Sequence, residues 1–199
     1  MSQPIHLTTP LSGDRVRRLR VNDIVSLTGT VFTARDMAHL KLRELKENGR
    51  PMPEDLEGSV IFHAGPVVKK REDGFDLLNI GPTTSIRMEP HSDFLGRLGV
   101  KAIVGKGGLG EGSVQAFRKY GMVYLLAAPG CGVLHARAVE RVKRVHWLEE
   151  MGMPEAIWVL EVKEWGPLMV AMDSEGGSIF QTIREEGLRK LDALVRDWK

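Results

Sequence analysis

Four side chains able to bind an anion stand where strands are expected to give way to helices. Arg35 and Lys106 each follow a predicted strand, and Thr83 and Arg87 lie in the segment Gly-Pro-Thr-Thr-Ser-Ile-Arg. Thr83 and Arg87 are four positions apart, so on a helix both would lie on one face and offer a hydroxyl and a guanidinium to the same oxygens. A set this rich in cations and poor in carboxylates favours a small anionic substrate such as a dicarboxylate.

Three other polar residues near these positions have simpler interpretations. Asp36 follows Arg35 and is well placed to cap the next helix. His39 could carry protons, but a histidine packed beside the start of a helix is the favoured interpretation. Cys131 lies between glycines and has no evident base to activate it, which favours a structural role.

The glycine-rich run 105–110, Gly-Lys-Gly-Gly-Leu-Gly, matches the dinucleotide-binding pattern G-x-G-x-x-G between a predicted strand and a predicted helix. Against this alternative, the next strand, 122–127, ends without an acidic residue to bind a ribose. The run could also be a plain turn, or it could hold Lys106 at a helix N-terminus to meet an anion.

Composition limits what the chain can do alone. With 199 residues and one cysteine, it cannot hold an internal disulfide framework, a thiolate-rich zinc site or an iron–sulfur cluster by itself. Its six histidines show no spacing typical of metal ligands, and no carboxylate pair suggests acid–base catalysis. As an enzyme, the chain looks incomplete.

The overall charge and hydropathy pattern predict a cytoplasmic protein. The formal net charge of +2 does not indicate a nucleic-acid surface, and the apolar run 122–128 is shorter than the ~18 residues of a membrane span. The N-terminal residues lack the pattern of a secretion signal.

Periodicity predicts an alternating α/β domain. The expected strands are 24–33, 59–64, 102–104, 122–127 and 156–162, and the expected helices are 36–48, 94–98, 111–120 and 138–150. A loop is expected from Gly81-Pro82, and a C-terminal helix is expected to bury the face that holds Ile179, Ile183, Leu188, Leu191, Leu194, Val195 and Trp198. The β-rich start indicates either that the sheet is mixed or that a second sheet packs nearby.

Several segments in a fixed order resemble one family. They are 7–11 (Leu-Thr-Thr-Pro-Leu), 33–39 (Thr-Ala-Arg-Asp-Met-Ala-His), 63–66 (His-Ala-Gly-Pro), 81–88 (Gly-Pro-Thr-Thr-Ser-Ile-Arg-Met) and 105–108 (Gly-Lys-Gly-Gly). With these segments, the chain is similar over most of its length to the β subunit, or C-terminal domain, of class I fumarases and tartrate dehydratases.

This resemblance implies a hydro-lyase β subunit that interconverts fumarate and (S)-malate, with tartrate dehydration as the alternative. It implies a single swivelling β/β/α domain over residues 1–199. It also implies a [4Fe-4S] cluster held by an α subunit, in a heterodimer or heterotetramer, and not by this chain. By motif match, Arg35, Thr83, Arg87 and Lys106 would contact the substrate, and Thr83 would be either the catalytic base or a hydrogen-bonding residue.

Overall fold

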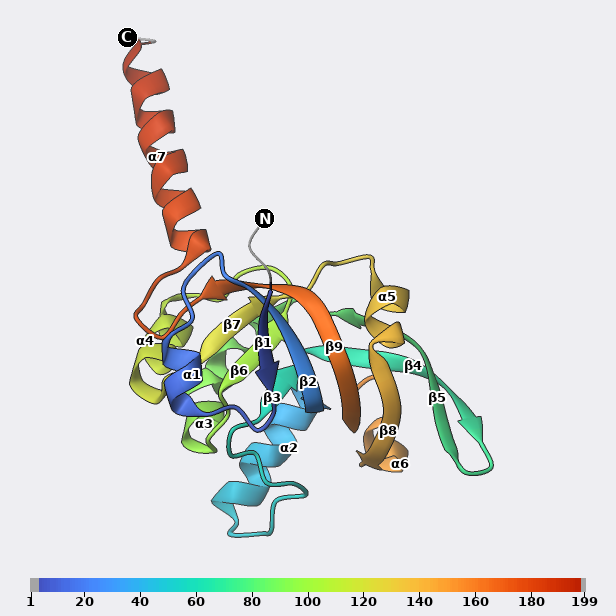
Figure 1. Cartoon of the computed structure of the whole chain (residues 1–199). Helices are drawn as coiled ribbons and strands as arrows, with labels where there is room; N and C mark the ends of the chain where they lie inside the picture. Colours follow the sequence, from blue (N-terminus) through green and yellow to red (C-terminus); the bar gives the residue numbers. More distant parts are fainter. Residues whose placement is uncertain (1–3, 198–199) are drawn as a thin grey trace.

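A seven-stranded mixed sheet organises the computed structural model, which describes residues 4–197 (Figure 1). The strands of this sheet are β1 (Ile5–Thr8), β2 (Ile24–Thr33), β3 (Val60–Phe62), β6 (Ala102–Gly105), β7 (Val123–Leu126), β8 (Val139–His146) and β9 (Ile157–Met172). Strands β1, β2, β3, β6 and β7 are parallel to one another in that order. The long strand β9 runs antiparallel to β7, β8 and β2, so its pairing with both β2 and β7 closes the sheet on itself.

The central strands are buried on both faces, as expected for parallel strands with few polar residues. On one face Val60, Phe62 and Val104 pack with Trp158 and Trp165 of β9 inside the curved sheet. Residues of the opposite face, which alternate with these along the strands, pack against helices. The sheet therefore lies between two separate apolar clusters.

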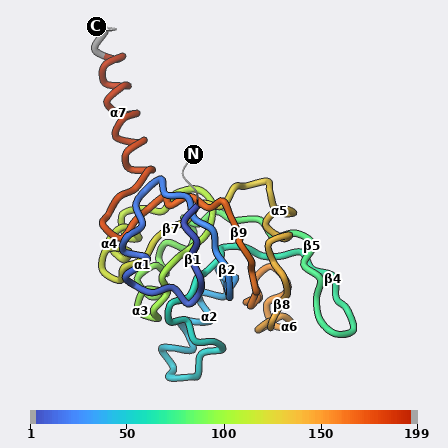
Figure 2. Tube along the Cα trace, in the orientation of Figure 1, coloured from blue at the N-terminus to red at the C-terminus, as the bar shows by residue number. Residues whose placement is uncertain are grey.

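Three helices cover the outer face. They are α2 (Asp36–Glu47), α3 (Ser92–Arg97) and α4 (Glu111–Tyr120), and Figure 2 shows the three near one another at the lower left of the body. Leu42, Leu95 and Phe117 anchor them to the sheet and are fully buried. Shorter helices lie elsewhere: α1 (Gly13–Arg17), α5 (Gly132–Arg137) and α6 (Leu148–Met151).

A two-stranded hairpin of β4 (Ala64–Arg71) and β5 (Gly74–Pro82) projects from the body. Gly81 and Pro82, expected to open a loop, instead pair with Gly65 and Ala64 at the end of β5. A 3₁₀ helix, η1 (Ser85–His91), then leads into α3.

The predicted helix 138–150 is wrong, because most of this segment forms β8. Val139, Val142 and Val145 recur every three residues, which resembles a helical face. In the structure, irregularities in the β8–β9 register between Val139 and Arg141 and between Val142 and Arg144 insert extra residues. They keep all three valines directed at the core, where they pack partly buried.

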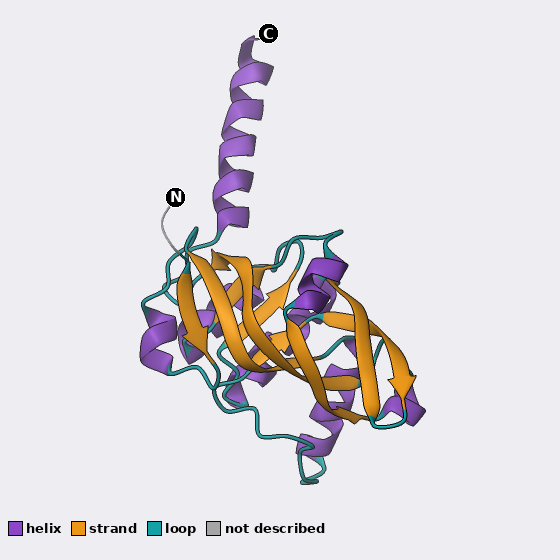
Figure 3. Cartoon of the chain, turned by 45° about the vertical axis from the view of Figure 1, so that its right-hand side comes forward, coloured by secondary structure: helices purple, strands orange, loops and turns teal. Residues whose placement is uncertain are grey.

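The C-terminal helix α7 (Ile179–Asp197) is confirmed, but the prediction that it buries an apolar face is not. The helix extends away from the sheet (Figures 1 and 3). Its apolar residues beyond the first turn are 52–65% exposed: Ile183, Leu188, Leu191, Leu194 and Val195. Trp198 lies outside the described residues.

The mixed sheet and the C-terminal helix confirm the predicted α/β fold class. The remaining predicted strands and helices are found within a few residues of their expected bounds, except that β9, expected to end at 162, continues to Met172. Among residues 4–197, no helix is both long and apolar enough to cross a membrane.

Candidate functional site

The carboxyl ends of β2, β3 and β6 bring the predicted site residues to one edge of the sheet. These strands are parallel neighbours, so the residues that follow them come out side by side. Arg35 lies two residues beyond β2, His63 directly follows β3, and Lys106 directly follows β6. The His63 amide donates to the carbonyl of Val104 at 2.8 Å, which continues the alignment past the strand ends.

Thr83 joins this edge through its backbone. Its amide donates to the carbonyl of His63 at 2.7 Å, and its carbonyl accepts from the amide of Lys106 at 3.3 Å. The Ser85 amide in turn donates to the carbonyl of Lys106 at 3.1 Å. Thr83 and Lys106, 23 positions apart in the sequence, are therefore held on adjacent backbone segments.

Arg87 contacts Thr83 as the spacing predicts, although η1 begins only at Ser85 and no α-helix connects the two residues. An Arg87 Nη2 donates to the Thr83 Oγ1 at 3.2 Å. The same guanidinium donates to both carboxylate oxygens of Asp36, at 3.1 and 3.0 Å. The hydrogen bonds from Arg87, helped by the nearby charge of Arg35, lower the pKa of Asp36, and Asp36 raises the pKa of Arg87.

Glu155 makes two contacts at the site that no pattern in the sequence predicts. Its carboxylate lies 3.3 Å from the Arg35 Nε and accepts from the amide of Met37 at 2.8 Å. Glu155 therefore caps the N-terminus of α2, while Asp36 binds Arg87 and does not act as the predicted cap.

Lys106 reaches a second environment beside this edge. With Gly107, Pro167 and Phe180 it lines a mostly apolar hollow of about 480 Å³. All four predicted residues thus lie at one end of the sheet, and the structure brings Arg87 and Thr83 into direct side-chain contact.

Three buried histidines lie behind the site and were not recognised as a group from the sequence. The ring of His39 lies 5.3 Å from that of His63 and 5.0 Å from that of His91, measured between centroids. The His39 Nδ1 is 2.6 Å from the carbonyl oxygen of Arg35, which confirms that His39 packs beside the start of the helix. Burial lowers the pKa of His39 to about 4, and it also lowers the pKa of His63. Both rings are therefore neutral at pH 7.

The glycine-rich run does not offer the open helix N-terminus that a dinucleotide needs. The amide of Gly110, at the start of α4, donates to a Glu89 carboxylate oxygen at 2.8 Å. A carboxylate of the protein thus occupies the position where a pyrophosphate would bind, and it would repel one. A Cβ on Gly105 would lie 1.9 Å from the Ser85 Oγ, so packing within the protein accounts for this glycine.

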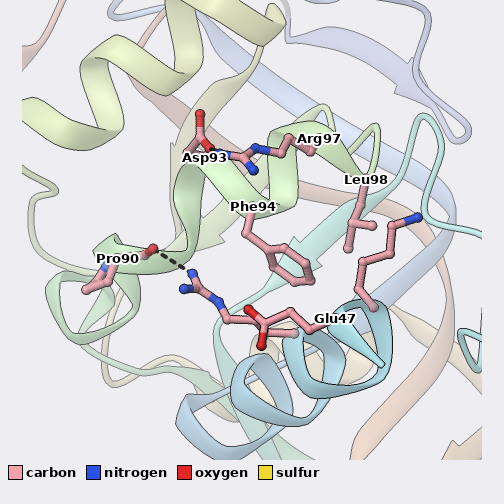
Figure 4. Close-up of a pocket in the computed structure, with 8 residues that line it drawn as sticks. Glu47, Pro90, Asp93, Phe94, Arg97 and Leu98 are labelled. Carbon is pink, nitrogen blue, oxygen red and sulfur yellow. Dashed lines mark hydrogen bonds and ion pairs between the residues drawn. The ribbon is translucent and has the colours of Figure 1, made fainter. Parts of the chain in front are cut away.

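A separate pocket of about 470 Å³ lies between α2 and α3 (Figure 4). Arg43 lines it, donates to the carbonyl of Pro90 at 3.0 Å and lies over the ring of Phe94. Cationic and acidic side chains both line this pocket, and none of the four predicted site residues does.

The described residues do not offer a ligand set for a metal centre. No group of three or more histidine, cysteine or acidic side chains in residues 4–197 is arranged to hold a metal ion. Cys131, the only cysteine in the sequence, is a free thiol of intermediate exposure.

The structure is thus an α/β domain with a mixed sheet, and it gathers two arginines, a lysine and a threonine near the carboxyl ends of its strands. The chain belongs to the family described as "Fumarase C-terminus", whose model matches residues 1–183. This membership confirms the resemblance inferred from the sequence motifs.

Individual relatives cover nearly the whole chain. The chain is 47% identical over 181 residues to a Methanocaldococcus jannaschii protein named "Putative L(+)-tartrate dehydratase subunit beta", covering 90% of this chain and 93% of that protein. It is 42% identical over 192 residues to the L(+)-tartrate dehydratase subunit beta of Escherichia coli K12, covering 96% and 94%. It is also 40% identical over 189 residues, 94% of this chain, to 35% of a Geobacillus stearothermophilus protein named "Putative fumarate hydratase class I".

Proposed function

We propose that this chain is the β subunit of a hydro-lyase that dehydrates L(+)-tartrate. The observation that carries the proposal is the 42–47% identity to tartrate dehydratase β subunits over at least 90% of both chains. The order of substrates expected from the sequence is therefore reversed, with tartrate first and fumarate second. Fumarate hydration stays the second candidate because of the 40% identity to the Geobacillus protein.

The proposed reaction removes a hydroxyl from one carbon of the dicarboxylate and a proton from the neighbouring carbon. The hydroxyl and the proton leave together as water. The resulting enol becomes a 2-oxo dicarboxylate by tautomerisation. Loss of the carbon-bound proton places extra negative charge on the adjacent carboxylate. Cations that bind this carboxylate more strongly as that charge develops accelerate the reaction, whereas equal binding of substrate and transition state does not.

Arg35, Arg87 and Lys106 are the groups assigned to the carboxylates in this proposal. Asp36 accepts from the Nε and Nη2 of Arg87 and Thr83 accepts from the same Nη2, which leaves the two N–H groups of Nη1, held in a fixed plane, to donate to a substrate carboxylate. Lys106 contributes a compact charge on a side chain whose backbone is hydrogen-bonded to that of Thr83.

Thr83 has two possible roles, and its contact with Arg87 supports both. The Oγ1 accepts a hydrogen bond from Arg87, which leaves the hydroxyl hydrogen available for a substrate oxygen. The same cation would stabilise an alkoxide if Thr83 acts as the base, since an unaided threonine hydroxyl is a weak base at neutral pH.

The proposal requires an α subunit. The relatives' names describe β subunits, and the [4Fe-4S] cluster implied by the resemblance needs thiolates that a chain with one cysteine does not supply. We assign the cluster to that partner and assign to this chain the binding and orientation of the dicarboxylate.

The test is an anaerobic assay of the chain co-expressed with its α partner on L(+)-tartrate, D-tartrate, meso-tartrate and fumarate. Turnover of L(+)-tartrate with the highest kcat/KM, absent from the α partner alone, is the expected result. Preference for fumarate would support the second candidate. Equal activity with and without this chain would make it a scaffold and overturn both.

A further inference from the structure

A buried chain of hydrogen bonds connects the segments that carry His63, Ser85 and Lys106. The His63 Nδ1 lies 2.9 Å from the Ser85 Oγ, which lies 2.9 Å from the hydroxyl of Tyr124 on β7. The Tyr124 hydroxyl also lies 3.0 Å from the carbonyl oxygen of Gly107, the residue after Lys106. His63, Ser85 and Tyr124 are each at most 1% exposed.

Only one assignment of protons satisfies all three contacts. The Gly107 carbonyl can only accept, so the Tyr124 hydroxyl donates to it. The Tyr124 oxygen then accepts from the Ser85 hydroxyl, whose oxygen accepts from a protonated His63 Nδ1. Burial raises the pKa of Tyr124, which keeps its proton in place as a donor, and lowers the pKa of His63, which keeps its ring neutral.

This chain of side-chain hydrogen bonds joins segments that are otherwise connected by only a few backbone hydrogen bonds. Its ends are His63, which accepts the amide of Thr83, and Gly107, which directly follows Lys106. Gly105 packs directly against the centre of this hydrogen-bond network. A Cβ at this position would lie 1.9 Å from the Ser85 Oγ and 3.1 Å from the Tyr124 hydroxyl, so the two hydroxyls are closely confined.

We propose that Tyr124, Ser85 and His63 are positioning residues, whose hydrogen-bond chain fixes the Lys106 loop relative to Thr83 so that both meet the same substrate. None of the three needs to touch the substrate, because each acts by holding Lys106 in place beside Thr83. The inference rests on the proposed function for its catalytic consequence, but the fixing of the loop can be measured without any activity.

The first experiment measures amide hydrogen exchange in the full-length chain for residues 105–110. Tyr124→Phe keeps the ring and removes the oxygen that supports Gly107. Exchange in this segment should become about 5-fold faster or more, the factor expected for loss of one ordinary hydrogen bond. Tyr120→Phe is the matched control, because the Tyr120 hydroxyl contacts Asp93 on α3 instead.

A second variant protects the test against misfolding. Ser85→Ala removes the middle hydroxyl of the hydrogen-bond chain and leaves the buried Tyr124 ring, which lies beside Phe180, in place. It should also accelerate exchange in 105–110. Unchanged exchange in this segment in both variants, with Tyr120→Phe as reference, would overturn the inference.

The second experiment is a double-mutant cycle in the assembled enzyme on L(+)-tartrate. Tyr124→Phe should lower kcat/KM about 10-fold through misplacement of Lys106. In a Lys106→Ala background the same change should have almost no further effect, because its route is already removed. Fully multiplicative losses would mean a general structural role and contradict positioning through Lys106. If the wild-type chain with its α partner has no hydro-lyase activity, the proposed function fails. The exchange experiment still decides whether the hydrogen-bond chain fixes the Lys106 loop.

Discussion

Arg87→Lys separates the charge of the side chain from its geometry. Arg87 makes three N–H donations, two to Asp36 and one to Thr83, at 3.0–3.2 Å. A lysine keeps the positive charge but has one nitrogen with three N–H groups, too few to keep the three contacts with Asp36 and Thr83 and also give a substrate carboxylate the two donors that Nη1 of Arg87 offers.

The effect on activity should exceed the effect on stability. The side chains of Arg87 and Asp36 are 43% and 38% exposed, so loss of their ion pair should cost less than about 1 kcal/mol of unfolding free energy. Loss of a charged hydrogen bond to the substrate should cost about 1.5–3 kcal/mol of transition-state stabilisation, or roughly a 10- to 150-fold fall in kcat/KM.

The assay is steady-state dehydration of L(+)-tartrate by the assembled enzyme, with urea unfolding of the β chain measured in parallel. Arg71→Lys is the control, because Arg71 also pairs with a single aspartate, Asp76, and their side chains are 50% and 45% exposed on the β4–β5 hairpin. A kcat/KM for Arg87→Lys within threefold of the Arg71→Lys value would remove Arg87 from the substrate site.

Three further predictions concern catalysis and pH. Thr83→Val removes the oxygen that Arg87 contacts. If Thr83 is the base, kcat should fall ~100-fold or more while co-purification with the α subunit is unchanged, and an effect confined to KM would restrict Thr83 to binding. Glu54→Gln should lower stability by about 1–3 kcal/mol at pH 7, because Glu54 is 12% exposed and accepts two hydrogen bonds from Arg144. The hydrogen bonds from Arg144 lower the pKa of Glu54, so this contribution is present above the unfolded value of 4.5 and is lost as the pH falls through the folded pKa. A difference in urea midpoint between wild type and Glu54→Gln that does not shrink as the pH falls below 4.5 would contradict it. In the folded chain the pKa of His39 is lowered from 6.5 to about 4, so as the pH falls the unfolded chain binds a proton at this residue before the folded chain does. Through His39, the free energy of unfolding of the wild-type chain should therefore fall by about 2 kcal/mol between pH 7 and pH 5. Equal urea midpoints for the wild-type chain at pH 7 and pH 5 would refute that sign.

The place of the site could be predicted from the sequence because it depends on the ends of parallel strands. β2 is rich in β-branched residues, β6 is a short apolar run, both have clear ends, and the residues that follow parallel neighbours must meet at one edge. Arg35 and Lys106 were located in this way, and the Thr83–Arg87 contact followed from their spacing.

What the sequence could not predict depends on distant partners. Glu155 lies 119 positions after Asp36 and still provides the cap of α2, so no local pattern reveals it. The three-residue spacing of valines in β8 matches a helix until its pairing with β9 introduces the irregularities. In α7 the spacing correctly indicated a helix with an apolar face, but periodicity does not say what, if anything, covers that face.

The charges at the site indicate what the proposed partner has to bring. Arg35, Arg87 and Lys106 carry three positive charges, and Asp36 and Glu155, at ion-pair distance from the two arginines, carry two negative charges. One net positive charge from these described residues meets a substrate with two negative charges, and removal of a carbon-bound proton adds further negative charge to it. Because each arginine is already paired within the chain, its strongest contribution is an oriented set of donors and not an excess of charge. The second carboxylate therefore needs a counter-charge from outside this set, and in the proposed enzyme the α subunit is the place for it.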